Sequence, residues 1–415
     1  MKPLAVSAFA LVAASVAFAQ QPVPSGEFKK IQLTNEFWAE GAHFGDFNKD
    51  GQMDVVAGPY WWAGPDFQKR YTIYPDTKRS KFKSDDGSEK EIAGFKGALS
   101  NTNDYSDNFL CFTQDFNNDG WTDVLVIGHP GKEAFWYENP QGKDQPWTKH
   151  LAYDVVENES PVFADVTGDG RPEIVCSANG FLGYAVPNPN DPTAKWTWRT
   201  ISPKGPWQRY THGIGVGDVN GDGRMDILEA NGWWEQPASL AGDPVWTKHE
   251  ALFGKGGAQM YAYDVNGDGR NDIITSLEAH KYGIAWFEQT NDGGVIGWTK
   301  HLIVGATPEE NPQGVVFSQP HAIDLVDMNG DGLKDIVTGK RFWAHGPKGD
   351  LEPNAAAVLY WFELKREGGK ASYVAHLIDD NSGVGTQVTA GDFNGDKKPD
   401  VVVGNKRGAF VFLRK

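Results

Sequence analysis

Short runs of β-branched and aromatic residues recur along the chain, separated by turns rich in Gly, Asp and Asn. Apolar positions alternate or cluster in these runs and do not recur at helical spacing. The runs fall into three strands of a repeating unit. Examples of the second strand are 335–338 and 400–403, and examples of the third are 134–138, 284–288 and 358–363. Examples of the fourth are 147–151, 246–250 and 298–302. A shorter alternating segment, such as 41–45, precedes the loop before each second strand and is the first strand of the unit. The pattern predicts units of four short strands.

One polar motif, Asp-x-Asn-x-Asp-Gly-x-x-Asp, occurs seven times between the first and second strands, with copies starting 46 to 69 residues apart. Its polar positions are Asp46, Asn48, Asp50 and Asp54; Asp115, Asn117, Asp119 and Asp123; Asp165, Thr167, Asp169 and Glu173; Asp218, Asn220, Asp222 and Asp226; Asp264, Asn266, Asp268 and Asp272; Asp327, Asn329, Asp331 and Asp335; and Asp392, Asn394, Asp396 and Asp400. Self-similarity at this period is typical of repeat architectures. Seven four-stranded units predict an all-β fold, a seven-bladed β-propeller.

The two ends of the chain complement each other. The last unit stops after its third strand, at 409–413, and an unassigned strand stands at 28–33. Pairing these strands would remove an exposed sheet edge. We therefore expect the N-terminal strand to complete the last blade, and residues 20–415 to form a single propeller domain.

The first residues have the composition of an export signal. Lys2 precedes an apolar run over 4–18 that ends in Ala17-Phe18-Ala19. We expect a signal peptide over 1–19 and a secreted or periplasmic protein with no membrane span. A membrane anchor is the alternative, but the run is shorter than the roughly 18–20 residues that a span needs. A net charge of −16 argues against a nucleic-acid partner, and two Cys exclude a disulfide-stapled scaffold.

The seven loops carry oxygen donors at alternate positions beside a glycine, a pattern that favours calcium. They are not EF-hands, because no helix is predicted beside them and position twelve of the first copy is Ala57. Seven divalent ions would offset most of the net charge of −16. Turns without an ion are the alternative, although their clustered carboxylates would repel one another. Loop three, with Thr167 and Glu173, and loop seven, with Lys397 in place of Gly, depart from the pattern.

The stretch 217–228, Gly-Asp-Val-Asn-Gly-Asp-Gly-Arg-Met-Asp-Ile-Leu, and its six relatives resemble the FG-GAP/VCBS repeat family, which includes the propeller of integrin α-chains. The resemblance covers nearly the whole mature chain and implies a seven-bladed propeller with calcium in the first hairpin of each blade. Thr211–Gly215 and Ser318–Ala322 carry a weaker resemblance to the propeller part of aldos-2-ulose dehydratase, whose cupin half has no counterpart here. Family membership does not decide function, because propellers host enzymes and binding modules alike.

The propeller face opposite the loops collects the chain's unusual polar residues. Counting back about six residues from each motif, we expect these side chains at the central mouth: Glu40, Phe109, Glu159, His212, Ala258, His321 and Thr386, with Gln259 and Gln387 beside them. The loops after the second strands open on the same face and add Tyr60, His129, Asn179, Asn231, Glu278, His280, Lys340, Arg341, Asn405 and Lys406. Charged or aromatic insertions over 76–105 and 340–357 enlarge this face, the second with Trp343 and His345. Other aromatic residues there, Tyr60, Trp61, Trp62, Trp233 and Trp234, suit stacking on sugar rings or packing between blades.

Two functions fit this face. The first is an exported carbohydrate lyase or dehydratase that abstracts a proton next to a carbonyl or carboxylate and eliminates a β substituent. Its catalytic candidates are His212, His321, Glu40, Glu159, His280, Lys340 and Arg341. Its substrate-binding candidates are Gln259, Gln387, Tyr60, His129, Asn231, Trp343, His345, Asn405 and Lys406. Two His and two carboxylates could also hold one catalytic divalent metal such as Zn²⁺.

The second function is a non-catalytic module that binds a glycan or a protein through the same face. Calcium alone in the purified protein would favour this module, and one zinc, iron or manganese per chain would favour the enzyme. We interpret the outer-strand residues His150, His249, His301 and His376 as structural, and Cys111 and Cys176 as buried free thiols or, alternatively, a bridge.

Overall fold

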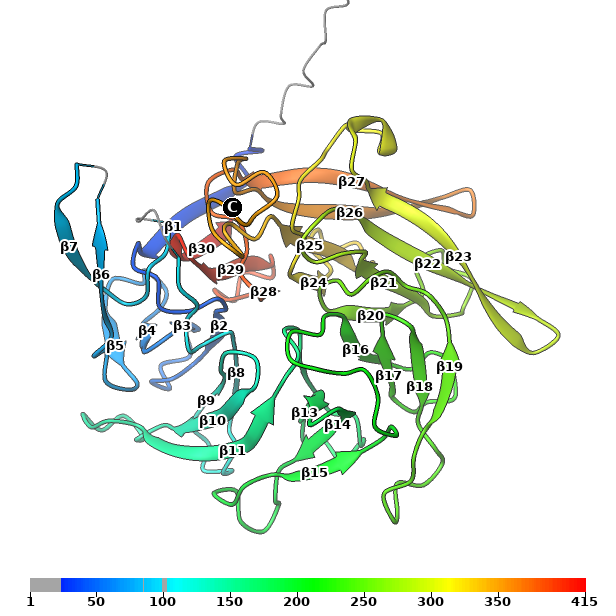
Figure 1. Ribbon diagram of the computed structural model, residues 1–415, viewed down its shortest axis with the longest axis horizontal. Helices are drawn as coiled ribbons and strands as arrows, with labels where there is room; N and C mark the ends of the chain where they lie inside the picture. The colour runs from blue at the N-terminus through cyan, green and yellow to red at the C-terminus, as the bar shows by residue number, and fades with distance from the viewer. Residues whose placement is uncertain (1–23, 85, 99–102) are drawn as a thin grey trace, which may run out of the picture.

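The computed structural model describes residues 24–84, 86–98 and 103–415, and the expected signal peptide over 1–19 lies outside them. The described chain is all-β, with one 3-10 turn, η1 (Pro308–Glu310). Small antiparallel sheets follow one another around a ring in a propeller-like arrangement (Figure 1). Within the described residues, no helix has the length and hydropathy to cross a bilayer.

Five of the sheets have four strands each. One comprises β2 (His43–Gly45), β3 (Asp54–Ala57), β4 (Tyr60–Trp62) and β5 (Arg70–Thr72). The next comprises β8 (Leu110–Gln114), β9 (Asp123–Ile127), β10 (Lys132–Glu138) and β11 (Thr148–Val156). Another comprises β12 (Val162–Ala164), β13 (Glu173–Ala178), β14 (Phe181–Val186) and β15 (Thr197–Thr200). The remaining two comprise β24 (Ile323–Val326), β25 (Asp335–Gly339), β26 (Leu359–Glu367) and β27 (Lys370–Asp379), and β28 (Val388–Gly391), β29 (Asp400–Asn405), β30 (Gly408–Arg414) and β1 (Phe28–Thr34).

An eight-stranded sheet completes the ring. It comprises β16 (Ile214–Gly217), β17 (Asp226–Glu229), β18 (Gly232–Glu235), β19 (Thr247–Glu250), β20 (Met260–Tyr263), β21 (Asp272–Ser276), β22 (Ile284–Asp292) and β23 (Val295–Val304). Its two antiparallel halves are joined only where β16 runs parallel to β20, at Gly215 opposite Met260 and Val216 opposite Tyr261. A Cβ atom at Gly215 would lie 2.1 Å from the Met260 carbonyl oxygen, so glycine is required for this close approach.

The predicted closure by the N-terminal strand is confirmed. Strand β1 pairs antiparallel with β30, from Phe28 opposite Arg414 to Thr34 opposite Ala409. The first and last strands of the described residues therefore share one sheet, and the edge of β30 is covered.

The hydrophobic core lies between neighbouring sheets. Every residue of β9 and of β13 is buried, because each is an inner strand of its sheet and is covered on both faces. Leu125 and Trp136 of one sheet pack in one cluster with Ile174 and Trp196 of the next. Each Å² of buried apolar surface stabilises the folded state by about 25 cal/mol. The packing between sheets is therefore the main contribution to the stability of the fold.

The seven motif copies form the turns between the first and second strands, as predicted. The glycine at the sixth motif position has positive φ, for example 83° at Gly51 and 87° at Gly332. In the seventh copy Lys397 takes this place with φ 68°, a conformation that strains a residue with a Cβ atom.

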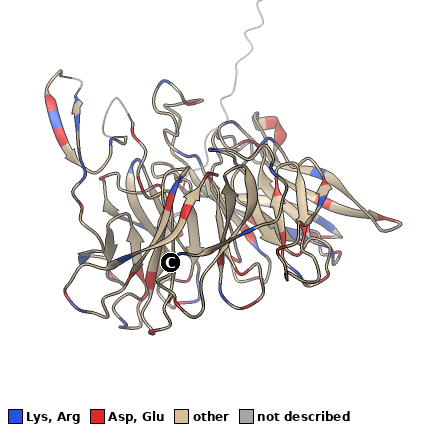
Figure 2. Ribbon diagram, turned by 60° about the horizontal axis from the view of Figure 1, so that its bottom comes forward, with Lys and Arg blue, Asp and Glu red and all other residues tan. Residues whose placement is uncertain are grey.

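Two local expectations are corrected or decided. The insertion over 76–105 is not wholly a loop, because β6 (Arg79–Lys83) and β7 (Glu89–Ala93) pair as a hairpin that projects from the ring and carries both signs of charge (Figures 1 and 2). Cys111 and Cys176 are buried free thiols, so the alternative of a disulfide bridge is wrong.

Candidate active site

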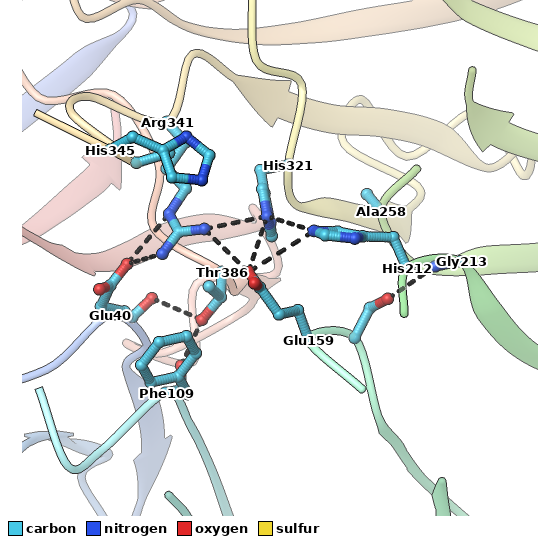
Figure 3. A network of polar contacts seen from close by, with 12 residues as sticks. Glu40, Phe109, Glu159, His212, Gly213, Ala258, His321, Arg341, His345 and Thr386 are labelled. Atoms are coloured by element: carbon cyan, nitrogen blue, oxygen red, sulfur yellow. Dashed lines mark hydrogen bonds and ion pairs between the residues drawn. The ribbon is translucent and has the colours of Figure 1, made fainter. Parts of the chain in front are cut away.

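Arg341 joins two carboxylates from distant parts of the chain (Figure 3). Its Nε donates to Glu40 Oε2 at 3.0 Å, and its Nη1 donates to Glu159 Oε2 at 3.1 Å. All three side chains are buried, and Arg341 is only 2% exposed. Charge-assisted hydrogen bonds are strong at buried positions, and removing one partner leaves a buried charge uncompensated. The three residues form a fixed electrostatic unit near the centre of the ring.

Backbone hydrogen bonds between neighbouring sheets set the positions of these carboxylates. The Glu40 N–H donates to Asn108 O at 2.8 Å, and Glu40 O accepts the N–H of Thr386 at 2.8 Å. The Glu159 N–H donates to Thr211 O at 2.9 Å. The segments just before the first strands are therefore tied to one another, and their side chains meet.

Two imidazoles complete the network. His321 Nε2 lies 2.9 Å from Arg341 Nη1, 3.1 Å from Glu159 Oε2 and 3.1 Å from His212 Nε2. His212 Nε2 lies 3.6 Å from Glu159 Oε2. The His280 ring packs against both imidazoles, with centroids 4.9 Å from His212 and 5.0 Å from His321. The structure thus brings together Glu40, Glu159, His212, His280, His321 and Arg341, six of the seven catalytic candidates.

The environment determines the charge of these groups. Burial, reinforced by the charge of Arg341, lowers the pKa of His321 to about 3. Burial and the neighbouring imidazoles lower the pKa of His280 far below its ordinary value. Burial alone would raise the pKa of Glu159, but its close contacts with the imidazoles and the charge of Arg341 hold it well below its usual range. At neutral pH the site holds the ionised carboxylate of Glu159 beside the unprotonated imidazoles of His280 and His321.

Lys406 adds a second buried cation. Its Nζ lies 3.8 Å from Glu40 Oε1, donates to Trp343 O at 2.6 Å and lies 4.5 Å from the centre of the Tyr105 ring. Burial lowers the pKa of Lys406 to about 8, although Glu40 opposes the shift. Through Trp343, this ammonium also fixes the insertion over 340–357 to the central network.

Lys340, the seventh catalytic candidate, does not join the network. Its Nζ donates to Ser318 Oγ at 2.5 Å and to Leu351 O at 3.2 Å, so it holds the insertion instead. Adjacent residues of an extended segment point to opposite sides, which explains why Arg341 reaches the site and Lys340 does not.

Three polar candidates for substrate binding are occupied by backbone groups. Gln387 accepts the N–H of Cys111 at 3.0 Å and donates to its carbonyl at 2.8 Å. Gln259 bridges the Ile323 N–H and the Thr386 carbonyl in the same way, and Asn405 donates to Ser382 O. The two glutamines join the backbones of different sheets, and the side-chain amides of all three residues are already hydrogen-bonded.

Most of the aromatic candidates pack between elements. Tyr60 donates to Asp76, Trp61 stacks on Tyr71, and Trp233 stacks on His249. Trp62 packs against Tyr60, and Trp343 donates its Nε1 to Pro353 O. His129 contacts Phe109 and lines a separate pocket of about 710 Å³.

A pocket of about 490 Å³ reaches the network at His212. Its wall includes Asn231, as expected, and Trp234. It also includes Trp207 and Lys248, which the sequence analysis did not single out. The aromatic segment around Trp207 precedes His212 by five residues, and that proximity to a candidate histidine was the available signal.

His345 lies at the solvent side of the site, on the 340–357 insertion. Its ring centroid is 4.4 Å from that of His280, and its Nδ1 is 3.7 Å from Asp350 Oδ1. The side chain of His345 is 47% exposed, whereas that of Asp350 is fully buried. The carboxylate can orient the imidazole toward the cluster, a pairing that the sequence analysis missed because both residues lie in an irregular loop.

The seven motif loops have a donor set that fits a hard cation. In the first loop, Asp46 accepts the N–H groups of Asp50 and Gly51 at 3.2 and 3.0 Å, and this folds the carboxylates around one centre. Loop three places one oxygen each of Asp165, Asp169 and Glu173 within 4.8 Å of one another. All donors in the seven loops are carboxylate, amide or hydroxyl oxygens, so the residues present fit calcium.

The last acidic residue of each motif also has a structural task. Asp123 accepts the N–H of Phe116 at 2.9 Å and the N–H of Asn139 at 2.8 Å. It thereby joins the loop to the end of the third strand. Burial raises the pKa of Asp123 to about 7, although these two hydrogen bonds act to lower it.

The four outer-strand histidines repeat one arrangement away from the central site. His301 stacks on Trp286 with centroids 4.2 Å apart, and its Nε2 lies 2.7 Å from Glu288 Oε2. The same stacking on a tryptophan and pairing with a glutamate occur at His150, His249 and His376. These contacts fix the fourth strand to the third.

Comparison with known families detects the repeats. Residues 115–176 and 264–338 match the FG-GAP-like repeat family, and residues 384–411 match the FG-GAP repeat family. The matched segments contain five of the seven motif copies, so the FG-GAP repeats expected from the sequence are confirmed. No curated protein matches the chain.

Several solved structures are weakly similar. The V. cholerae biofilm matrix protein Bap1 is 16% identical with a TM-score of 0.31, over 66% of this chain and 40% of Bap1. This chain thus spans well under half the length of Bap1. Rhamnogalacturonan lyase YesW is 12% identical with a TM-score of 0.44, over 93% of this chain and 75% of YesW. A Bacillus licheniformis rhamnogalacturonan lyase is 11% identical with a TM-score of 0.43, over 94% and 75% of the two chains.

Proposed function

We propose that the protein is a carbohydrate lyase or dehydratase whose active site is the network around Arg341. One observation carries the proposal: Glu159, His212, His321 and Arg341 come from separate segments and are linked by contacts of 2.9–3.1 Å beside a pocket. Clustered groups with strongly shifted pKa values are typical of sites that transfer protons. The segments Thr211–Gly215 and Ser318–Ala322, which resemble the dehydratase propeller, contribute His212 and His321.

The reaction would begin with removal of a proton from the carbon next to a carboxylate or ketone. His212, with 13% of its side chain exposed, and His345, with 47%, are the two candidate proton acceptors that a substrate can reach. The electrons of the broken C–H bond form an enolate, and the positive charges of the buried Arg341 and Lys406 stabilise it electrostatically from the interior side of the site. The enolate then forms a C=C bond and expels the oxygen substituent on the β carbon, which takes the proton back from the imidazolium. No oxidant or reductant is consumed.

The pocket beside His212 suits a sugar that carries a negative charge. Lys248 and Lys255 supply cations, and Trp207 and Trp234 supply apolar wall. Lys248 is paired with Glu229 at 3.1 Å, and Lys255 lies farther from its partner, Glu278, at 3.7 Å. Lys255, whose side chain is 77% exposed, is the more accessible of the two cations. A uronic acid or a keto-sugar combines the acidic C–H bond with the ring that such a pocket can hold.

The scaffold is proposed to be a calcium-stabilised, seven-bladed propeller, exported by the signal segment. The eight-stranded sheet counts as two blades, because only two parallel residue pairs join its halves. Calcium held by the motif residues would neutralise the clustered carboxylates of each loop and supply rigidity rather than chemistry. Chelation should lower the melting temperature, and Ca²⁺ but not Mg²⁺ should restore it. An unchanged melting temperature would exclude structural calcium.

Activity on defined substrates tests the proposed function. Oligogalacturonates, alginate oligosaccharides and glucos-2-ulose are incubated with the protein, and the ultraviolet absorbance of the unsaturated product is followed. Replacement of the proton acceptor, by His212→Ala or His345→Ala, should lower turnover about 10²-fold or more. His301→Ala, on the outer strand, is the matched control. Full turnover in both site variants would refute the site, and tight binding without turnover would favour the non-catalytic glycan-binding module instead.

A further inference from the structure

We propose that Glu159, His212, His280 and His321 bind one divalent transition-metal ion of the zinc class. The four residues lie just before β12, just before β16, just after β21 and just before β24. Each offers one ligand atom, and the four atoms lie within 4.8 Å of one another. The metal site is independent of the proposed lyase activity, because an ion that binds without any turnover would still confirm the site.

The spacing of the donors matches a tetrahedral ion. Bonds of about 2.0–2.2 Å to such an ion place neighbouring ligand atoms about 3.3–3.6 Å apart. The pairs His321–Glu159 and His212–His321 are 3.1 Å apart, and the pair His212–Glu159 is 3.6 Å apart. His280 needs only a small inward movement, since its ring already packs against both of the other imidazoles.

The hydrogen bonds around His321 bring two lone pairs face to face, an arrangement that a bound ion explains. Arg341 can only donate, so the contact from its Nη1 requires a lone pair on His321 Nε2. The proton of this neutral imidazole is then on Nδ1, and Nε2 faces Glu159 Oε2 at 3.1 Å without a hydrogen between the two lone pairs. Lone pairs of His321 and Glu159 therefore point into one small volume, and His212 Nε2 lies beside it at 3.1 Å from His321 Nε2. A cation at that point can bind all three atoms.

The donor chemistry separates this site from the motif loops. Three imidazoles and one carboxylate favour zinc, cobalt, iron or manganese, whereas calcium prefers oxygen ligands alone. His321 is fully buried, and His212 opens into the pocket of about 490 Å³, which supplies an entry path. With the ion in place His212 becomes a ligand, and the role of proton acceptor in the proposed lyase falls to His345.

Arg341 occupies part of the same volume, and this assigns different roles to the two carboxylates. Its Nη1 contacts both His321 and Glu159 and has to withdraw when an ion binds. Glu40 keeps the opposite side of the guanidinium through Nε at 3.0 Å and Nη2 at 2.5 Å. Glu40, a ligand candidate in the sequence analysis, is therefore a positioning residue that holds Arg341, and Glu159 is the ligand.

Metal binding by the full chain tests the assignment. Protein stripped with a chelator and refilled with excess Ca²⁺ is titrated with Zn²⁺ against a chromophoric chelator, and the retained zinc is counted by elemental analysis. One zinc per chain is expected in the presence of calcium. His280→Ala and Glu159→Gln should each weaken zinc binding by more than about 10-fold. His301→Ala, a histidine paired with a glutamate outside the cluster, should bind as the wild type.

A spectroscopic measurement keeps the test decisive if a variant fails to fold. Co²⁺ added to the calcium-loaded wild type should give the intense visible bands of a tetrahedral site, and Zn²⁺ should abolish them. Absence of these bands, or zinc binding that His280→Ala leaves unchanged, would overturn the proposal. Lyase turnover by a protein that binds no zinc would refute only the proposed metal site. One bound zinc without turnover on any substrate would refute only the proposed lyase activity.

Discussion

Arg341 Nη1 lies 3.1 Å from Glu159 Oε2, although 182 residues separate the two along the chain. The contact exists because the ring brings the end of one second strand next to the start of another first strand. It makes Arg341 the shared partner of Glu40 and Glu159, and the electrostatic balance of the central site depends on it.

Replacement of Arg341 by Met should destabilise the fold. The substitution leaves Glu40 and Glu159 buried without their common cation, and breaking a buried pair in this way costs roughly 3–5 kcal/mol. Denaturant unfolding measures the free energy. Arg171→Met, which removes an exposed ion pair with Asp169, should cost less than about 1 kcal/mol. Equal effects of the two variants would show that the central pairing does not hold the fold.

Removal of the closing strand should destabilise the entire ring. Deletion of residues 26–35 removes β1 and exposes the edge of β30. The melting temperature should fall and the transition should broaden, with Lys29→Ala, an exposed position of the same strand, as the control. An unchanged melting temperature would mean that closure contributes nothing to stability.

Lys397→Gly should stabilise the seventh loop. Lys397 has φ 68°, where a side chain costs about 1 kcal/mol relative to glycine. The free energy of unfolding should rise by up to about that amount. Lys398→Gly, at the next position, lacks this strain and should be neutral or destabilising. A loss of stability in Lys397→Gly would refute the strain argument.

Lys406 should leave a signature in the dependence of stability on pH. Its pKa is lowered to about 8 in the fold, against about 10.4 in an unfolded chain. Between these values the unfolded chain binds more protons, so the unfolding free energy of the wild type should rise with pH relative to Lys406→Met. Denaturant unfolding at several pH values over that window gives the difference between the two proteins. Parallel profiles would mean that Lys406 titrates normally.

The sequence predicted the ring and its closure because both follow from local patterns. The motif marks each first hairpin, and the unit without a fourth strand indicates the partner of β1. Counting back from the motif also predicted that Glu40, Glu159, His212 and His321 would meet, since the repeat places equivalent positions at equivalent radii.

Side-chain partners were not predictable in the same way. Lys340 and Arg341 are neighbours of similar charge, and only the direction of each side chain decides which reaches the network. Gln259 and Gln387 have the polarity of ligand-binding groups, but their amides are hydrogen-bonded to the backbones of other sheets. The pairing of His345 with Asp350 depends on an irregular loop, for which the sequence contains no periodic signal.

Anomalous diffraction above and below the zinc absorption edge, from crystals grown with calcium and zinc, tests the central claim most directly. The account predicts one zinc peak among Glu159, His212, His280 and His321, with the Arg341 guanidinium moved away from His321 and still bound to Glu40. A map in which Arg341 keeps its contact with His321 and no zinc peak lies at the centre of the ring would contradict it.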